Sequence, residues 1–432
     1  MTELTKAHAA RRIAVIGAGI SGMGAAYMLA ESHDVVLFEA ENRLGGHART
    51  KMAGRNGDQA VDTGFIVFNY ANYPHMAKLF ADLDVPVTKS NMSFGASIAG
   101  GKLEYGLASL GALFAQKRNL TNPKFLRMVR DILRFNARAL AASDEVGLTI
   151  GGLMKKLRLG DYFRDHYLLP LSGAIWSTPT QKILDFPAHA MMRFFENHAL
   201  LGITGQHQWY TVKGGSIEYV TRLGAAMTER GVQTRLGCAA EAVRRTPQGV
   251  MVKAPGAEWE AFNEVVFATH SDITLRLLDD PSPEEQAMLG AIRYQPNSIV
   301  LHSDPSVMPK NRSVWSSWVY AEGHDKVLDQ IDLTYWMNSL QPWLTQDPLF
   351  VTLNTTRPIR EDLIWDKVTL HHPVYDLAAL AAQEQAAQMN GTNRTWFCGA
   401  WMKNGFHEDG LSSAVDVVRA MSAGPAVAVA AE

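Results

Sequence analysis

Three glycines near the start of the chain have the spacing of a phosphate-binding turn. Gly17, Gly19 and Gly22 stand in the segment GAGISG. The apolar run just before them, 13–16, predicts a buried parallel strand, and 23–30 predicts a helix. In such a turn the glycines permit a tight bend, close approach of a pyrophosphate, and close packing of helix on strand. The helix N-terminus offers amides to the phosphates, so the segment predicts dinucleotide binding.

A second apolar run, 35–38, predicts the next strand of the same unit, and it ends in an acid, Glu39. A carboxylate at this position can accept hydrogen bonds from a ribose diol. It also disfavours the 2′-phosphate of NADP, which would be repelled. These residues alone leave NAD and FAD both open.

The segment that follows departs from a plain NAD-binding unit, which would continue into another crossover helix. Gly45 and Gly46 lie between Arg43 and Arg49. The glycines let the backbone lie against a flat or anionic ligand, and the arginines can neutralise a pyrophosphate. A strand predicted at 61–67 contains an internal glycine, which often marks close approach of a ligand or another backbone.

With motifs farther along the chain, these residues resemble the FAD-dependent amine oxidase and phytoene desaturase superfamily. The matching segments are GAGISG, Glu39, RLGGHART at 43–50, VDTGF at 61–65, VKGGS at 212–216, EAV at 241–243, VVFATH at 265–270, FCGAW at 397–401 and DGLSSA at 409–414. They occur in the order of the family and span nearly the whole chain. A fixed FAD, held from both ends of the chain, explains more of them than an exchangeable NAD does.

The resemblance implies which residues bind the FAD. They are Gly17, Gly19, Ile20, Ser21, Gly22, Glu39, Ala40, Arg43, Gly45, Gly46, His47, Arg49, Thr63, Gly64, Phe65, Val243, Ala268, Thr269, Gly399, Ala400, Phe406, His407, Gly410 and Leu411. Two segments depart from the family pattern. Ala400 stands where an acid is common, and 404–408 replaces a glycine-rich approach to the flavin ring.

The same resemblance implies an α/β fold in which a Rossmann-like FAD-binding domain with its βαβ unit carries a discontinuous α+β substrate domain. The FAD domain would use 1–90, 208–285 and 388–432, and the substrate domain 91–207 and 286–387. Sequence texture agrees with this division. Short β-rich runs at 294–302, 314–320, 331–337 and 349–354 alternate with turns, and 107–142 has a helical pattern.

A flavin enzyme needs few catalytic side chains, because the flavin accepts the hydride and the protein positions the substrate. His407 and Glu408 are the titratable residues we nominate for proton handling near the flavin. The alternative is that their backbone alone meets the flavin. His371 and His372 are adjacent, so they point to opposite sides of an extended chain, and we expect no metal site there.

Aromatic residues and methionines are frequent in the predicted substrate domain and suit an apolar pocket, although they suit an ordinary core equally well. We expect Trp209, Trp401, Phe195 and Trp336 to line the substrate. Few acids lie near these segments to hold a cationic amine, and Glu196 and Asp332 are the candidates. An apolar chain is therefore favoured over a polyamine.

A narrower resemblance concerns GGHART, VDTGFIVFN and the C-terminal GFHEDGL. This combination is similar to a branch of flavoproteins associated with cyclopropane-fatty-acid-synthase-like methyltransferases. The similarity implies a dehydrogenase or desaturase acting on an unsaturated or methyl-branched acyl chain, with a lipid methyltransferase as partner. An amine or porphyrinogen oxidase is the alternative within the superfamily. The non-catalytic alternative is a flavin-bound accessory that only delivers lipid to the methyltransferase.

Composition sets wider limits on the protein. The 432 residues are 47% hydrophobic and 19% charged, with a formal net charge of −2, so nothing global suggests a nucleic-acid partner. The two cysteines, Cys238 and Cys398, fit a reducing compartment better than a disulfide framework. No apolar run reaches the length of a membrane span. We expect a cytoplasmic protein, in peripheral contact with the membrane at most.

One predicted helix, 124–140, separates a basic face from an apolar face that includes Leu133. Basic residues continue upstream, so that 117–138 contains a single acid, Asp131. The ordinary interpretation is a core helix with a solvated basic face. The alternative is a surface that attracts anionic phospholipid headgroups, and we keep both open.

Overall fold

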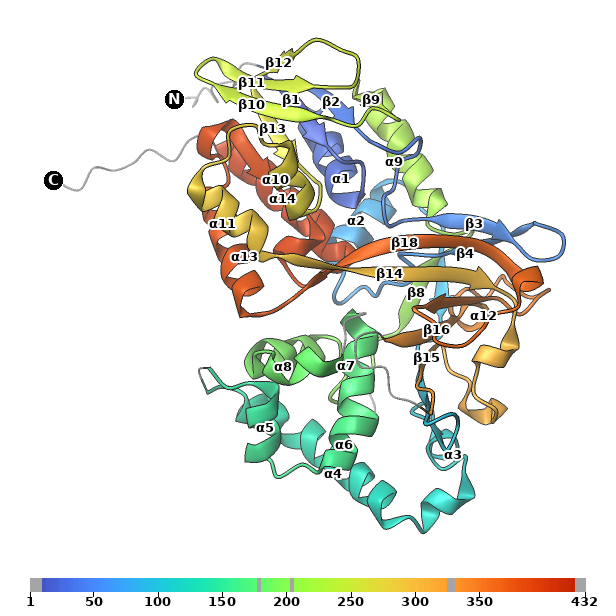
Figure 1. Cartoon of the computed structure of the whole chain (residues 1–432). Coiled ribbons are helices and arrows are strands. Elements are labelled where there is room, and N and C mark those ends of the chain that lie inside the picture. Colours follow the sequence, from blue (N-terminus) through green and yellow to red (C-terminus); the bar gives the residue numbers. More distant parts are fainter. Residues whose placement is uncertain (1–9, 146, 177–179, 203–205, 325–330, 424–432) are drawn as a thin grey trace, which may run out of the picture.

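A computed structural model describes residues 10–145, 147–176, 180–202, 206–324 and 331–423 (Figure 1). Its upper part contains a five-stranded parallel sheet in the order β19-β13-β1-β2-β9. The strands are β1 (Arg12–Ile16), β2 (Asp34–Phe38), β9 (Gln233–Arg235), β13 (Glu264–Phe267) and β19 (Thr395–Phe397). This sheet confirms the predicted α/β class with a Rossmann-like unit.

Strand β1 is apolar after its first residue, Arg12, because both faces of its sheet are covered. Ile13 and Val15 pack under the helices α1 (Ile20–Leu29), α9 (Ile217–Glu229) and α14 (His407–Ala423). Ala14 and Ile16 face the other side, where they pack with the elements β10 (Ala242–Thr246), β11 (Gly249–Lys253), β12 (Glu260–Phe262), α10 (Ser271–Leu277), α11 (Pro283–Ala291) and α13 (Leu377–Met389). Such two-sided burial is typical of parallel sheets.

A seven-stranded sheet crosses the middle of the molecule in the order β18-β14-β17-β16-β15-β6-β7 (Figure 1). Its strands are β6 (Phe94–Ile98), β7 (Leu103–Gly106), β14 (Arg293–His302), β15 (Trp318–Ala321), β16 (Asp332–Trp336), β17 (Phe350–Leu353) and β18 (Ile364–Val374). Three of the four predicted β-rich runs closely match strands. The run at 314–320 becomes a strand only from Trp318, because a 3₁₀ turn over Arg312–Val314 precedes it.

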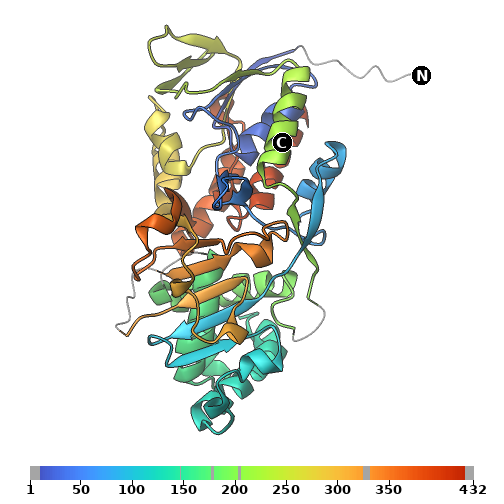
Figure 2. The ribbon, with the colours of Figure 1, turned by 90° about the vertical axis from the view of Figure 1, so that its right-hand side faces the viewer.

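Helices form the lower end of the molecule, below this sheet (Figures 1 and 2). They are α3 (Leu110–Leu113), α4 (Pro123–Ala142), α5 (Ile150–Lys156), α6 (Asp161–Phe163), α7 (Leu169–Trp176) and α8 (Ala188–Asn197). The helical pattern predicted at 107–142 is thus confirmed. The assignment of Leu133 to the apolar face was wrong, because that face is centred on Phe125, Met128 and Phe135, and Leu133 is 48% exposed.

Short elements join the two parts of the molecule. They are the hairpin of β3 (Thr50–Ala53) and β4 (Gln59–Asp62), the pair β5 (Val87–Ser90) and β8 (Trp209–Val212), and the helices α2 (Pro74–Asp82) and α12 (Met337–Leu340). The strand predicted at 61–67 ends at Asp62. Gly64 lies so close to the neighbouring chain that an added Cβ would be 1.9 Å from the His47 carbonyl oxygen, so its glycine does mark close backbone approach.

The two sheets divide as the predicted segments do. All five strands of the first sheet come from the segments assigned to FAD binding, and all seven of the second come from those assigned to the substrate. The domain boundaries themselves stay predictions. In the described ranges no helix is long and apolar enough to cross a membrane.

A buried carboxylate, Asp62, joins three distant segments where β4 ends. It accepts hydrogen bonds from the Thr50 hydroxyl (2.6 Å), from the Ser216 amide and hydroxyl (2.9 and 2.7 Å), and from the Gln341 amide (2.6 Å). Burial raises the pKa of Asp62 to about 6, even though these donors act to lower it.

Asp62→Asn should change how stability depends on pH. The folded pKa of Asp62, about 6, lies above the usual value of 3.8, so the native state holds an extra proton between these values. Wild-type stability from this group therefore falls as pH rises from about 4 to about 6, by on the order of 3 kcal/mol. Urea unfolding across this range should show this contribution in the wild type and in the exposed control Asp58→Asn. The slope should be smaller by this amount in Asp62→Asn, where Asp409, whose pKa burial also raises to about 6, still contributes. Parallel curves for all three proteins would contradict it.

Candidate active site

The turn between β1 and α1 is packed so tightly that two of its positions exclude any side chain. Gly17 has a φ of +99°, and an added Cβ would lie 2.9 Å from the carbonyl oxygen of Ala268. At Gly22 an added Cβ would lie 1.7 Å from the Gly17 carbonyl oxygen. The Ala268 amide donates to Ile16, 2.8 Å away. These contacts fix the N-terminus of α1 at the carboxyl edge of the sheet, next to Thr269.

Gly19, the middle glycine, is different because an added Cβ there would meet nothing within 4 Å. It is the N-cap of α1, and no side chain caps this helix end. The first-turn amides of Ile20 and Ser21 therefore lie beside open space. An uncapped helix N-terminus beside a side-chain-free cradle suits a pyrophosphate.

Glu39 lies at the end of β2 next to this cradle. Its carboxylate accepts hydrogen bonds from the amides of Ala18 (2.6 Å) and Glu41 (2.8 Å), and the neighbouring Ala40 is exposed. The side chain is thereby held at the edge of the sheet where the predicted ribose would lie.

The double-glycine loop, which contains Gly45 and Gly46, lies directly against the GAGISG fingerprint at 17–22. The Gly45 amide donates to Ala18 (2.8 Å), and an added Cβ at Gly46 would be 3.0 Å from the Gly19 Cα. Arg43 holds this loop in shape, because its guanidinium donates to the carbonyls of Gly46 (2.8 Å) and Ala48 (3.1 Å).

Arg49 connects this loop to the second sheet. Its guanidinium forms a bidentate ion pair with Asp366 of β18, with N–O distances of 2.5 and 3.1 Å, and also donates to the Thr63 hydroxyl. Both arginines therefore have protein partners in the structure. Their predicted contact with a pyrophosphate stays a prediction.

The C-terminal segment closes on the same turn. An added Cβ at Gly410 would be 2.8 Å from the Ser21 hydroxyl, and one at Gly24 would be 2.5 Å from the Leu411 side chain. Helix α14 therefore packs closely on α1, and Figure 1 shows the two helices as neighbours. The Gly399 amide donates to the Ser413 hydroxyl, 2.9 Å away, which fixes the approach to α14.

Two further predicted FAD contacts lie in regular structure. Val243 is fully buried in β10, and its carbonyl accepts from the Asp279 amide at 2.9 Å. The Ala400 carbonyl accepts from the Gly405 amide at 3.1 Å, which shapes the turn that leads to Phe406. Neither position shows a contact that tests its predicted role.

Four half-buried histidines gather near the loop. His47 lies 5.9 Å from His270 and 5.6 Å from His372, measured between ring centroids. Burial lowers the pKa of His47, and burial together with His47 lowers the pKa values of His270, His372 and His407 to about 3. All four are therefore neutral at physiological pH.

Sequence reasoning nominated only His47 and His407 of this group as cofactor-site residues. His372 turns inward from β18 while His371 is exposed, which confirms that the adjacent pair points to opposite sides of the strand. His270 was missed, although it stands three residues after β13 ends. The carboxyl edge of a parallel sheet is where ligand-facing residues are expected, so this signal was available.

His407 is held between two aromatic residues at the start of α14. Its imidazole stacks on Phe65, with ring centroids 4.0 Å apart, and shares a 2.6 Å hydrogen bond with the Tyr219 hydroxyl. The ring therefore has a fixed orientation and remains a candidate for contact with the flavin.

Glu408 lies at the N-terminus of α2. Its buried carboxylate accepts from the amides of His75 and Met76, both at 2.9 Å, and lies 2.7 Å from the His75 ring nitrogen. These contacts cap α2, because Pro74 supplies no donor at the first helical position. Helix capping therefore occupies both oxygens of Glu408, and its role in proton handling stays a prediction.

Two of the four predicted substrate-lining aromatics are core residues, and a third is half-buried. Trp401 is buried and donates to the Thr269 carbonyl at 3.1 Å. Phe195 is fully buried among helices, and Trp336 packs edge-on against Trp315 in a small separate cluster. Residue type alone does not determine which way a side chain faces, and the substrate-lining roles of these residues stay predictions. Trp209 is half-buried and faces His198, 6.5 Å away.

An aromatic array connects the helices to the start of α14, and sequence reasoning nominated only its members Trp209 and Phe406. Phe194 stacks on Phe406, with centroids 5.1 Å apart, and on His198, at 3.9 Å. Trp209 continues the array beyond His198. Burial lowers the pKa of His198, so this wall carries no charge at neutral pH. We call these four residues the aromatic wall.

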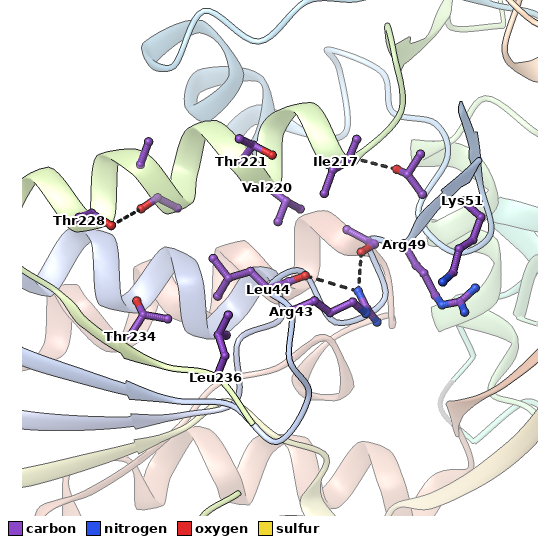
Figure 3. Close-up of a pocket in the computed structure, with 14 residues that line it drawn as sticks. Arg43, Leu44, Arg49, Lys51, Ile217, Val220, Thr221, Thr228, Thr234 and Leu236 are labelled. Carbon is purple, nitrogen blue, oxygen red and sulfur yellow. Dashed lines mark hydrogen bonds between the residues drawn. The ribbon is translucent and has the colours of Figure 1, made fainter. Parts of the chain in front are cut away.

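A separate open pocket of about 480 Å³ lies on the outer side of the double-glycine loop, against α9 (Figure 3). Its lining includes Arg43, Leu44, Ile217 and Val220. The fingerprint glycines do not line it, so this pocket is distinct from the cradle at Gly19.

Comparison with known proteins decides the family. The family model of flavin-containing amine oxidoreductases matches residues 20–313, more than half of the chain. The chain belongs to this family. Its cofactor is accordingly FAD, and the cradle at α1, with its open glycine and uncapped amides, fits the pyrophosphate of that group.

Solved structures confirm the fold across the whole chain. A fatty acid isomerase from P. acnes has a TM-score of 0.65 at 14% identity, covering 95% of this chain and 98% of its own. Cyclohexylamine oxidase from Brevibacterium oxydans has a TM-score of 0.66 at 14% identity, covering 96% and 100%. Putrescine oxidase bound to putrescine has a TM-score of 0.64 at 12% identity, covering 96% and 99%.

A local sequence match agrees with this family. A 41-residue stretch is 49% identical to an L-amino acid oxidase from Cerastes cerastes. The match covers 9% of this flavoprotein and only 8% of that relative.

Gly19→Ala should separate cofactor binding from folding in this flavoprotein. A methyl group at Gly19 meets no protein atom, but it projects beside the amides that would hold the pyrophosphate. Thermal unfolding of the apoprotein should match wild type, whereas retained FAD, read from flavin absorbance, should fall at least tenfold. Gly22→Ala is the comparison, since its methyl group would collide with the Gly17 carbonyl and destabilise the fold itself. Normal FAD retention by Gly19→Ala would place the pyrophosphate elsewhere.

Glu408→Gln should lower stability and leave the flavin chemistry intact. Loss of the charged cap of α2 should cost about 1–2 kcal/mol in urea unfolding. The rate at which substrate reduces the flavin, per mole of bound FAD, should stay within twofold of wild type and of the exposed control Glu384→Gln. A large loss of reduction rate at unchanged stability would identify Glu408 as a proton-handling residue.

Proposed function

We propose that this FAD-dependent oxidoreductase removes a hydride from an apolar lipid, such as an unsaturated or methyl-branched acyl chain linked to a phospholipid. The observation that carries the proposal is the aromatic wall. Phe194 is buried, whereas His198, Trp209 and Phe406 are half-buried, and together they form a continuous uncharged aromatic surface that ends at Phe406, the residue before His407. Such a surface favours a hydrocarbon chain.

Both acids that the sequence offers for a cationic amine are already paired. Asp332 already forms an ion pair with Arg357 at 2.8 Å, and Glu196 is paired with Arg193 on the surface at 2.9 Å. Neither candidate acid is therefore free to hold an ammonium group. The neutral histidines beside the loop offer no negative charge either.

These contacts assign a role to each group of the site. Bound FAD supplies the hydride acceptor. The aromatic wall excludes water and aligns the chain, while Tyr219 and Phe65 hold the His407 ring in one orientation. With its pKa lowered to about 3, His407 is a weak base and acts as a neutral hydrogen-bonding group.

The similar structures leave the substrate open, because their names include a fatty acid isomerase as well as amine oxidases. The first supports an acyl substrate in this fold. A lipid methyltransferase as partner belongs to the proposal and rests on the sequence resemblance alone.

Anaerobic mixing tests the proposal directly. Purified holoenzyme is mixed with dispersed unsaturated fatty acids and with phospholipids that carry them, and with putrescine and cyclohexylamine as the contrast. Flavin absorbance near its visible maximum should bleach with the lipids and remain with the amines. Mass spectrometry should find lipid products lighter by two hydrogens.

The other outcomes separate the alternatives. Rapid bleaching by an amine alone would identify an amine oxidase, and bleaching by a porphyrinogen would identify that class. A flavin that never bleaches, with no lipid converted to product, would support the accessory that delivers lipid to a methyltransferase.

A further inference from the structure

The helical end of the molecule carries a surface that is both basic and apolar. Its basic residues are Lys117, Arg118, Lys124, Arg127, Arg130, Arg134 and Arg138, and its exposed leucines are Leu107, Leu110, Leu120, Leu126 and Leu133. We call this set the α3–α4 surface. Figures 1 and 2 both place α3 and α4 at the end of the molecule opposite the parallel sheet.

The leucines are unusual because they cluster. Across the described chain, eleven large hydrophobic side chains are exposed, and five of them lie between 107 and 133. Leu110 is 77% exposed and Leu120 is 54% exposed. Single exposed apolar residues need no explanation, but a group at one end of a molecule indicates an interaction site.

The charge of this surface is almost entirely of one sign. Asp131 is the single acid between 107 and 143, and it is buried, where it accepts from the Gly160 amide at 3.0 Å. Within the described part of the chain, Lys117, Lys124 and Arg138 have no ion-pair partner. A chain with a net charge of −2 therefore concentrates positive charge at one end.

Leucines and arginines alternate on the same exposed side of α4. Leu126, Arg130 and Leu133 follow one another at helical spacing, with Arg127 and Arg134 beside them. A nucleic acid would leave the leucines without a partner. An interface of anionic headgroups over acyl chains accommodates both kinds of side chain, and interfacial helices have this pattern.

We infer that the α3–α4 surface docks the enzyme on an anionic phospholipid bilayer. The basic side chains contact the headgroups and the leucines enter the boundary of the acyl region. This inference goes beyond the proposed function, since docking would hold for any substrate. It nevertheless agrees with an acyl substrate. The buried side of α4 packs on α8 through Phe135 and Phe195, 6.3 Å apart, and α8 carries Phe194 of the aromatic wall.

Vesicle co-sedimentation of the holoenzyme tests the inference. Vesicles of phosphatidylcholine alone are compared with vesicles of phosphatidylcholine mixed with phosphatidylglycerol. The protein should sediment with the mixed vesicles, and binding should weaken as salt is raised because headgroup attraction is screened. Equal binding to both vesicles, or no binding to either, would overturn the inference.

Variants locate the contact. Lys117→Gln, Lys124→Gln and Arg138→Gln together should weaken binding by about a hundredfold, since each charge near an anionic surface contributes about fivefold. The control combines Lys89→Gln, Arg276→Gln and Arg419→Gln, which remove three exposed charges elsewhere, and it should bind as wild type does. Equal losses in both triples would show that only net charge matters and would refute a dedicated surface.

Variants of the leucines test the apolar contribution to binding separately. Leu126→Gln with Leu133→Gln should weaken binding at high salt, where the apolar contribution remains, while FAD content and thermal unfolding stay as in wild type. If this double variant binds vesicles at high salt as wild type does, insertion of the leucines is excluded. Flavin bleaching by dispersed fatty acid needs no bilayer, so failure of docking and failure of the proposed substrate can be distinguished.

Discussion

The fold depends on a buried carboxylate that holds together parts of the chain far apart in sequence. Asp62 binds the hydroxyl and amide of Ser216 at the start of α9, and it binds Gln341 just after α12. A discontinuous fold needs such connections, because neighbouring segments of the chain belong to different layers. The Arg49–Asp366 ion pair also connects segments that are far apart in sequence. Both connections lie next to the double-glycine loop, so the geometry of the cofactor site is set by how the two sheets are joined.

Local patterns predicted the parts of the structure that local interactions decide. The β1–α1–β2 unit follows from its apolar runs and glycine spacing, and the strands at β14, β16 and β17 follow from their β-branched and aromatic residues. The start of α1 was placed too late, because the fingerprint residues Ile20–Gly22 form the first helical turn themselves. β18 was missed, although its exposed and half-buried residues alternate as in an edge strand.

Long-range packing decided the rest of the site, and sequence patterns do not contain it. Glu408 was nominated for its chemistry, yet its carboxylate caps a helix that begins more than 300 residues earlier. Trp401 and Phe195 have the side chains of a substrate pocket and lie in ordinary cores. Phe194, the neighbour of Phe195, belongs to the same core cluster and also stacks on Phe406. Adjacent residues on a helix point about 100° apart, so two neighbouring phenylalanines have different contacts.

The close packing of α14 on α1 has a consequence for how the flavoprotein matures. The cradle at Gly19 forms early in the chain, but the Gly410–Ser21 and Leu411–Gly24 contacts complete its surroundings only when the last described helix docks. A growing chain cannot enclose the cofactor until that helix has been synthesised. Enclosure of FAD is therefore a late step of maturation, because it requires a helix that is synthesised almost four hundred residues after the cradle.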